Sequence, residues 1–115
     1  MSQECLFCKI SSGEIPADKV YEDDVCLAFN DISPQAPTHV LIIPRKHIAS
    51  LEDASSEDKG ILGHLLLTAA SIAREKNFEE KGYRVVINTN EDAGQTVFHI
   101  HVHLLGGRKF VFPPG

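Results

Sequence analysis

The chain has 115 residues, the usual size of one domain, so a single domain over residues 1–115 is expected. Its net charge is −5 with neutral histidines and it has no long run of Lys or Arg, which argues against a nucleic-acid polymer as partner. Residues 1–10 carry no signal-peptide pattern, and no segment reaches the roughly 20 apolar residues that span a bilayer. The odd number of cysteines disfavours a secreted disulfide framework. We therefore expect a cytoplasmic protein without a membrane partner.

The first half of the chain is expected to hold a short helix and three strands. Turn-forming residues over 11–16 mark the first break, and Pro34 and Pro37 exclude a strand or helix interior between the second and third strands. The expected elements are one or two helical turns over Cys5–Ile10, a hairpin of Lys19–Glu22 and Val25–Phe29, and a strand over His39–Ile43.

The second half is expected to hold one long helix and two strands. Apolar side chains recur at helical spacing behind a candidate N-cap at Ser55 or Ser56, and this helix should end near Lys76. Two β-rich runs follow, Tyr83–Thr89 and Val97–Leu105. Strands that suit antiparallel pairing, together with a single long helix, predict an α+β fold with helical cover on one face of the sheet.

Histidine alternates with β-forming residues in the last of these runs. In a strand, His99, His101 and His103 would share one face at intervals of about 6.6 Å, while the apolar residues between them face the core. On a helix the same rings would scatter. Neighbouring imidazoles cannot all be protonated, so at least one should be neutral near pH 7 and able to attack phosphorus as a nucleophile. A protonated neighbour could donate to the phosphoryl oxygens.

Other interpretations of these residues stay open. A single histidine on an apolar strand is usually structural, and His-x-His on a strand also presents two ligands to zinc. The preceding loop, residues 90–96, contains Gly94, which would let the backbone approach a phosphate closely. A polar hairpin loop without a function would have the same composition.

The segment His99–Leu105 resembles the signature of the histidine triad (HIT) family, His-φ-His-φ-His-φ-φ with φ hydrophobic. The similarity covers nearly the whole chain, through the blocks Glu14–Ala17, Tyr21–Asp24, Leu27–Phe29, Asp31–His39, Gly94–Gln95, Leu105–Arg108 and Pro113–Gly115. The Asp31–His39 block and the Pro-Pro-Gly end are similar to the Hint branch, the nucleoside phosphoramidases. The resemblance implies a five-stranded antiparallel sheet with one long and one short helix, and a homodimer in which two sheets join into one.

The resemblance also implies roles for individual residues. His101 matches the nucleophile that becomes nucleotidylated. His99 and His103 match its phosphate-binding and hydrogen-bonding partners, and His39 matches a fourth histidine that buttresses them. Asp31 matches the carboxylate that holds the ribose hydroxyls. The purine pocket would comprise Phe7, Ile10, Phe29, Ile32 and Leu41, and the phosphate loop Asn88, Gly94, Gln95 and Thr96.

Cys5 and Cys8 have a separate functional interpretation. Some bacterial members of the family hold a structural zinc with such a pair and two histidines, and the matching positions are His47 and His99. A closed four-ligand site stabilises a fold and leaves no open position for catalysis, so zinc would be structural and no cofactor would be required for the reaction. Two free thiols or a redox pair are the alternatives. Cys26 is expected to be a small core residue.

The implied activity is hydrolysis of purine nucleoside 5′-phosphoramidates, which are amine conjugates of AMP, GMP or related adenosine nucleotides, through a nucleotidyl-His101 intermediate. Thr96 stands where many relatives have Ser and is expected to help the amine leave. Phe112 stands where several relatives have Trp, which leaves the preference for the leaving group open. The alternatives are cleavage of dinucleoside polyphosphates or nucleotidyl transfer, and a nucleotide- or zinc-binding interaction module with vestigial activity.

Overall fold

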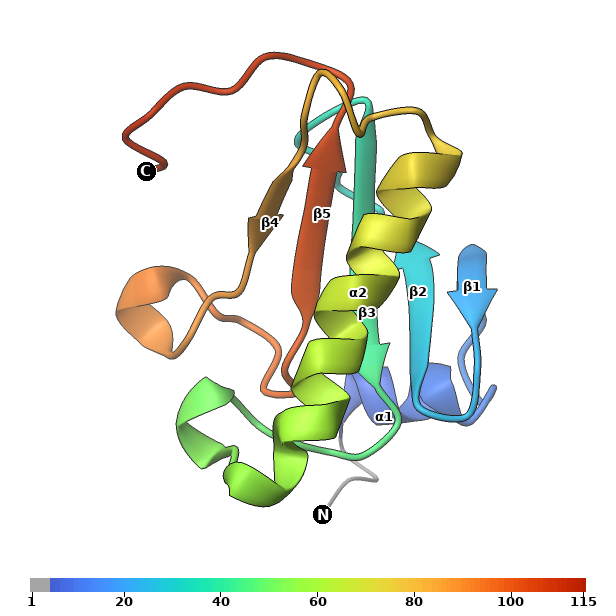
Figure 1. Cartoon of the computed structure of the whole chain (residues 1–115). Helices are drawn as coiled ribbons and strands as arrows, with labels where there is room; N and C mark the ends of the chain where they lie inside the picture. The colour runs from blue at the N-terminus through green and yellow to red at the C-terminus, as the bar shows by residue number, and fades with distance from the viewer. Residues whose placement is uncertain (1–4) are drawn as a thin grey trace.

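Five antiparallel strands form one sheet in the computed structural model, which describes residues 5–115 (Figure 1). The strands are β1 (Lys19–Glu22), β2 (Cys26–Asn30), β3 (Thr38–Pro44), β4 (Arg84–Val86) and β5 (Val102–Gly106), in the spatial order β1-β2-β3-β5-β4. The helices are α1 (Leu6–Ser11) and α2 (Lys59–Glu75). The expected α+β class, with five strands and one long and one short helix, is confirmed. Residues 1–4, part of the segment without a signal-peptide pattern, lie outside the described residues.

The long helix α2 covers one face of the sheet. The register places Val40 opposite Leu104 and Ile42 opposite Val102. These four side chains are fully buried and form one core cluster with α2 residues such as Leu65. Burying each aliphatic side chain contributes about 1.5–3 kcal/mol, so this cluster fixes β3 and β5 against each other. The cluster thereby also fixes the intervening residues of β3 and β5, whose side chains point to the sheet face opposite α2.

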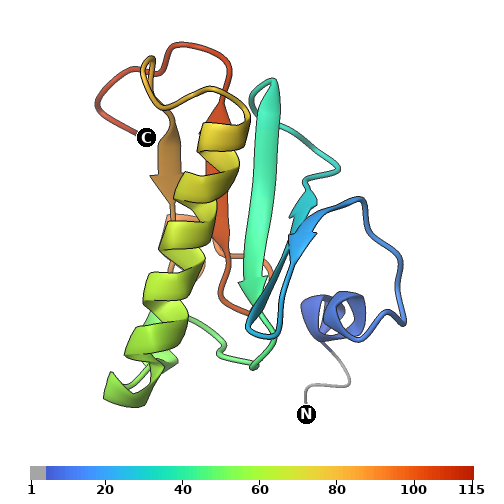
Figure 2. The same cartoon turned by 45° about the vertical axis from the view of Figure 1, so that its right-hand side comes forward.

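The short helix α1 packs on the opposite face of the sheet, as Figure 2 shows. Phe7 and Ile10 of α1 are buried with Phe29 and Leu41 in a second cluster. Leu41 pairs with His103, so the histidine face of β5 is the one that α1 covers. The expectation that helices cover only one face is therefore wrong. A helix of 6 residues carries too few apolar positions for its periodicity to reveal the face it buries.

The start of α2 follows the predicted capping pattern. The Ser55 side chain accepts a hydrogen bond from the Glu57 main chain, and the Asp58 side chain accepts one from the Ser55 main chain. These bonds satisfy N–H groups that a helix start leaves unpaired, and a short 3₁₀ turn, Ser56–Asp58, leads into α2. Within residues 5–115, neither helix has the length and apolar character needed to cross a bilayer.

The last two strands are shorter than the sequence predicts. The chain bends at residues 97–99, so β5 begins at Val102 and not at 97, and β4 is likewise shorter than the expected run 83–89. Two bonds to distant residues accompany the bend: Ile100 N–H donates to Ile48 O at 2.6 Å, and His99 Nε2–H donates to Pro44 O at 2.8 Å. Since both acceptors lie far away along the chain, local alternation could not predict the bend.

Candidate active site

A cavity of about 470 Å³ opens on the α1 side of the sheet. Its walls are mainly apolar, and a few polar side chains reach it, including those of Asp31, Thr96, His101 and His103. A mostly apolar cavity with a few convergent polar groups is the usual form of a small-molecule site.

The apolar residues expected to form the purine pocket all line this cavity: Phe7, Ile10, Phe29, Ile32 and Leu41. Phe7 and Phe29 pack edge to face with their ring centroids 5.6 Å apart. Four of the five side chains are buried, whereas Ile32 is 99% exposed and lies at the mouth of the cavity. A flat apolar ring could be enclosed here by preformed walls.

His101 is nearly buried, and its contacts leave Nε2 as the reactive nitrogen. Its Nδ1 lies 2.8 Å from the carbonyl oxygen of His99. Because a carbonyl oxygen only accepts, Nδ1 carries the hydrogen and Nε2 of the neutral ring carries the lone pair. Burial lowers the pKa of His101, and Phe7 packs edge-on against the ring at 5.1 Å. The ring therefore stays neutral near pH 7, as a nucleophile requires.

His103 and His39 form a hydrogen-bonded pair beside the His101 ring. His39 Nε2 lies 2.9 Å from His103 Nδ1, and the centroids of the His101 and His103 rings are 5.0 Å apart. Burial, together with the neighbouring histidines, lowers the pKa of His103 to about 4. Its Nε2 is buried and has no hydrogen-bond partner among residues 5–115. A buried ring nitrogen without a partner at the wall of a cavity indicates that a ligand supplies the partner.

Asp31 lies on the loop between β2 and β3 and lines the same cavity. Its Oδ1 accepts a hydrogen bond from the Ser33 main chain at 2.8 Å, and its Oδ2 lies 3.4 Å from His39 Nε2. The first contact is a local turn that fixes the carboxylate. The remaining lone pairs can accept hydrogen bonds from hydroxyl groups of a ligand.

His99 turns away from the cavity, so the expectation that all three imidazoles share one face is wrong. The bend at 97–99 brings its Nδ1 to 3.3 Å from Cys5 Sγ, 3.5 Å from Cys8 Sγ and 3.3 Å from His47 Nδ1. Burial lowers the pKa of His99 to about 4. Two histidines of the triad therefore line the cavity, and the third contributes its main-chain oxygen as the hydrogen-bond acceptor that holds His101.

Thr96 is the only one of the four expected phosphate-loop residues that lines the cavity. Gln95 is 4% exposed, and its side-chain amide bonds main-chain groups of Ala49, Asn90 and Val97, so it braces the loop from inside. The other two residues expected there, Asn88 and Gly94, are not part of this lining either.

Part of the cavity wall was missed by the sequence-based prediction. The additional lining residues are Leu6, Ile15, Pro16, Ala17, Asp18, Asn30 and Val97. The Glu14–Ala17 block could have indicated this part of the wall, because it belongs to the family resemblance. Its proline, however, is equally typical of an ordinary turn. Phe112 lies on the C-terminal segment with 86% of its surface exposed and does not line the cavity.

A neutral histidine, backed by a second histidine, lies at an apolar cavity on a five-stranded α+β sheet, and this arrangement defines a class of protein with a histidine-based small-molecule site. The HIT domain model matches residues 12–110, and the chain belongs to this family.

Named relatives agree with the family assignment. A HIT-like protein of Synechococcus elongatus is 56% identical over 115 residues, which is the full length of both chains. The purine nucleoside phosphoramidase of Escherichia coli K12 is 53% identical over 108 residues, covering 94% of this chain and 91% of the relative. The crystal structure of a HIT family hydrolase from Legionella pneumophila has a TM-score of 0.96 and 54% identity, covering 97% of this chain and all of the other.

Proposed function

We propose that the protein hydrolyses purine nucleoside 5′-phosphoramidates to a nucleotide and an amine. The observation that carries this function is the His101 ring, which is neutral, held through Nδ1 and left with its Nε2 lone pair at a nucleotide-sized cavity. A relative with 53% identity is named for this activity.

In the first step the His101 Nε2 lone pair attacks the α-phosphorus, the phosphorus–nitrogen bond breaks, and nucleotidyl-His101 forms. The departing amine takes up a proton, and the Thr96 hydroxyl, acting with a neighbouring histidine, is the proposed route because Thr96 lines the cavity. Positive charge develops on the His101 ring and strengthens the Nδ1–H bond to the His99 oxygen.

In the second step water attacks the phosphorus, the bond to His101 Nε2 breaks, and the electron pair returns to that nitrogen. The water proton returns to Thr96 and its neighbouring histidine, which gave a proton to the amine, and the products are a nucleoside 5′-monophosphate and neutral His101. In both steps the Nε2 of His103, which has no partner in the described part of the chain, lies beside the nucleophile, where an N–H can donate to a non-bridging phosphoryl oxygen.

The cavity suits the rest of a purine nucleotide such as AMP or GMP. The apolar walls formed by Phe7, Phe29 and Leu41 would enclose the base, and both oxygens of Asp31 can accept from the two ribose hydroxyls.

Rates on two substrates, together with AMP binding, test this function against its alternatives. We expect fast hydrolysis of an AMP–amine conjugate and turnover at least about 100-fold slower with diadenosine polyphosphates, because the site has a proton source suited to an amine. Faster cleavage of the polyphosphates would favour the alternative hydrolase. Tight AMP binding without turnover of either substrate would favour an interaction module.

We also propose a structural zinc bound by Cys5, Cys8, His47 and His99. A tetrahedral zinc with bonds of about 2.0–2.3 Å separates its ligand atoms by roughly 3.3–3.8 Å. The His47 and His99 Nδ1 atoms are 3.3 Å apart, and Cys8 Sγ lies 3.3 Å from His47 Nδ1. The Nε2–H of His99 donates to Pro44 O, which leaves its Nδ1 as a lone pair for the metal. A reducing cytoplasm, the proposed location, would keep both thiols available.

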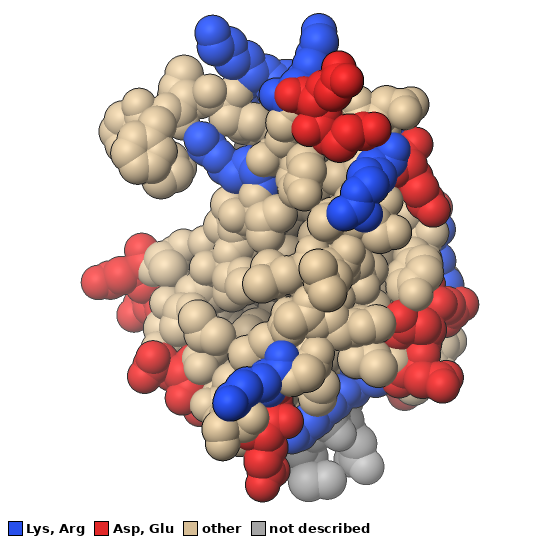
Figure 3. All heavy atoms as spheres, in the orientation of Figure 1, with Lys and Arg blue, Asp and Glu red and all other residues tan. Residues whose placement is uncertain are grey.

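A homodimer is the proposed assembly. β4 forms an edge of the sheet, and Val85 on it is partly exposed. Leu66 and Leu67 of α2 are 46% and 71% exposed, and Figure 3 shows few charged side chains over the middle of this face of the molecule. A second copy paired along β4 would remove the open edge and cover apolar side chains.

A further inference from the structure

A continuous chain of hydrogen bonds runs from the C-terminal segment to the cavity. We propose that Gln35 and Arg108 are positioning residues: the Gln35 main-chain N–H fixes which nitrogens of His39 and His103 carry hydrogen, and Arg108 holds Gln35 in place. The inference rests on the proposed function for its effect on turnover, whereas the hydrogen pattern itself can be measured without any substrate.

The Gln35 main-chain N–H sets the donor and acceptor of each hydrogen bond that follows it toward the cavity. Gln35 N lies 3.0 Å from His39 Nδ1, and a main-chain N–H only donates, so His39 Nδ1 must be a lone pair. The hydrogen of His39 is then on Nε2, from which it is donated to His103 Nδ1 at 2.9 Å. The hydrogen of His103 is therefore on Nε2, the buried atom without a partner among residues 5–115.

This pattern matters because of the charge that the site must receive. With its hydrogen on Nε2, His103 presents a donor to an anionic phosphoryl oxygen. The reverse pattern would place a hydrogen on His103 Nδ1 and turn a bare lone pair toward the anion. Asp31 Oδ2, 3.4 Å from His39 Nε2, favours the same hydrogen position on His39. Without the Gln35 donor, His39 Nδ1 becomes free to take a proton, and the pattern is no longer fixed.

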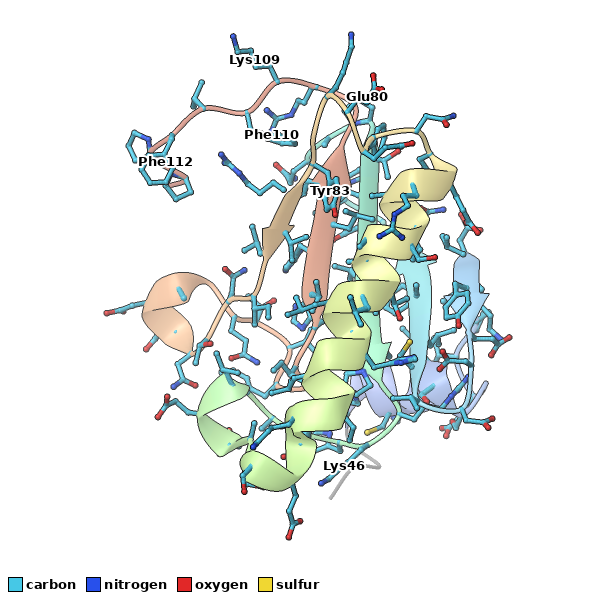
Figure 4. All side chains as sticks on the ribbon, in the orientation of Figure 1. Lys46, Glu80, Tyr83, Lys109, Phe110 and Phe112 are labelled. Carbon is cyan, nitrogen blue, oxygen red and sulfur yellow. The ribbon has the colours of Figure 1, made fainter. Side chains whose placement is uncertain are left out.

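Arg108 clamps Gln35 from the other side. Its Nε and Nη2 both donate to Gln35 O, at 3.2 and 3.1 Å. Its guanidinium lies over the Phe110 ring at 4.3 Å, and Figure 4 shows Phe110 directed back toward the sheet, whereas Lys109 points away from it. A stacked guanidinium with two bonds to one oxygen loses much of its freedom to move, so it can restrain the loop.

The close approach of two segments makes this clamp possible. Gly107 has a φ of 94°, and a Cβ on it would lie 2.9 Å from Pro37 Cβ. Only a residue without a side chain fits comfortably there, so the end of β5 lies directly against the loop that carries Gln35. Arg108 does not line the cavity, and Gln35 links its guanidinium to the histidines, so we expect its effect on the reaction to pass through Gln35.

The test combines ¹⁵N NMR of the histidine rings with steady-state kinetics on an AMP–amine conjugate. In the wild type we expect ¹⁵N signals of a bare Nδ1 on His39 and a protonated Nε2 on His103. Arg108→Ala should broaden or shift these signals and lower kcat about threefold to tenfold with little change in KM, and Arg108→Lys should restore part of the loss. Lys109→Ala is the matched control and should leave signals and kcat unchanged.

A second pair of variants removes the donor itself. Gln35→Pro deletes the N–H and should place hydrogen on His39 Nδ1, with kcat lowered about 10–100-fold, whereas Gln35→Ala keeps the N–H and should keep the wild-type nitrogen signals. Unchanged signals in both Arg108→Ala and Gln35→Pro would overturn the proposal, as would an Arg108→Ala effect confined to KM. A protein with the expected signals but no turnover would instead count against the proposed function alone.

Discussion

The His101 ring makes two contacts that together prepare its Nε2 for chemistry. The His99 carbonyl binds the hydrogen on Nδ1 and sets the direction of the ring, and Phe7 packs against it. Burial lowers the pKa of His101 and so keeps the lone pair available near neutral pH. The proposed nucleophile is thus oriented by the main chain and kept neutral by its surroundings.

Replacing this ring should remove the chemistry and spare binding. We expect His101→Ala to lower kcat about 10³-fold or more while AMP binding, measured by calorimetry, changes little, because the lost atom acts in the bond-forming step. His64→Ala is the control, since His64 lies on α2 and bonds Asp23 outside the site. Turnover in His101→Ala equal to that of the control would exclude a His101 nucleophile.

The half-buried His103 should make the fold less stable in acid. Its pKa of about 4 in the folded state lies below the ordinary value of 6.5, so the unfolded chain takes up the proton first as pH falls. The free energy of unfolding should therefore decrease between pH 6.5 and 4 and be unaffected by this group above that window. As the pH is lowered from 6.5 to 4, the urea midpoint should fall less steeply in His103→Asn than in the wild type. An equal dependence of the midpoint on pH in the two proteins would contradict the assignment.

At the level of residues, the sequence predicted which side chains line the cavity better than it predicted the direction in which individual side chains point. The five apolar residues expected to form a purine pocket line one cavity together with His101 and His103. The direction of His99 was not predictable, because it depends on a bond to Pro44, 55 positions away in the chain. Gln95 could not be identified as a buried brace for the same reason, since its acceptor on Ala49 is distant in sequence.

Among the elements, α1 stands out because it joins two sites. Phe7 on α1 packs against His101, and Cys8 on the same helix faces His47 and His99. A metal in the cysteine–histidine cluster would therefore fix the helix that forms one wall of the cavity beside His101. Loss of the metal should loosen this wall and lower stability.

Zinc content can be checked on the purified protein by elemental analysis. We expect stoichiometric zinc in the wild type, much less in Cys8→Ser, and a melting temperature lowered by several degrees in that variant, since about 1 kcal/mol shifts a domain of this size by roughly 4–8 °C. Cys26→Ala removes a buried cysteine outside the cluster and should retain zinc. Wild-type protein prepared in zinc-containing medium but free of metal would contradict the proposal.

The helices and strands were predictable where the pattern was local. α2 was placed within a residue of its end because its apolar stripe and its capping residues near Ser55 lie in one stretch of sequence. The start of β5 was wrong because the alternation of histidines continues through a bend that tertiary hydrogen bonds create. A pattern of period two thus gave the face of His101 and His103 but not the extent of the strand.

At the scale of the whole molecule, the open edge at β4 and the apolar surface of α2 predict self-association. We expect light scattering to give a mass near twice the 12.7 kDa of one chain. Leu67→Glu should shift the measured mass toward that of one chain, because a charge would be buried in the interface. A substitution of an exposed charge on the other side of the sheet, Glu14→Gln, is the control. A wild-type mass of one chain at high concentration would exclude the dimer.

The most direct test of the account is detection of the covalent intermediate. Brief mixing with an AMP–amine conjugate, a quench at neutral to alkaline pH and intact-mass measurement should reveal one added adenylate group, and peptide mapping should place it on His101. The adduct should be absent from His101→Ala. Rapid release of AMP with no adduct at any mixing time, or an adduct on another residue, would contradict the central claim.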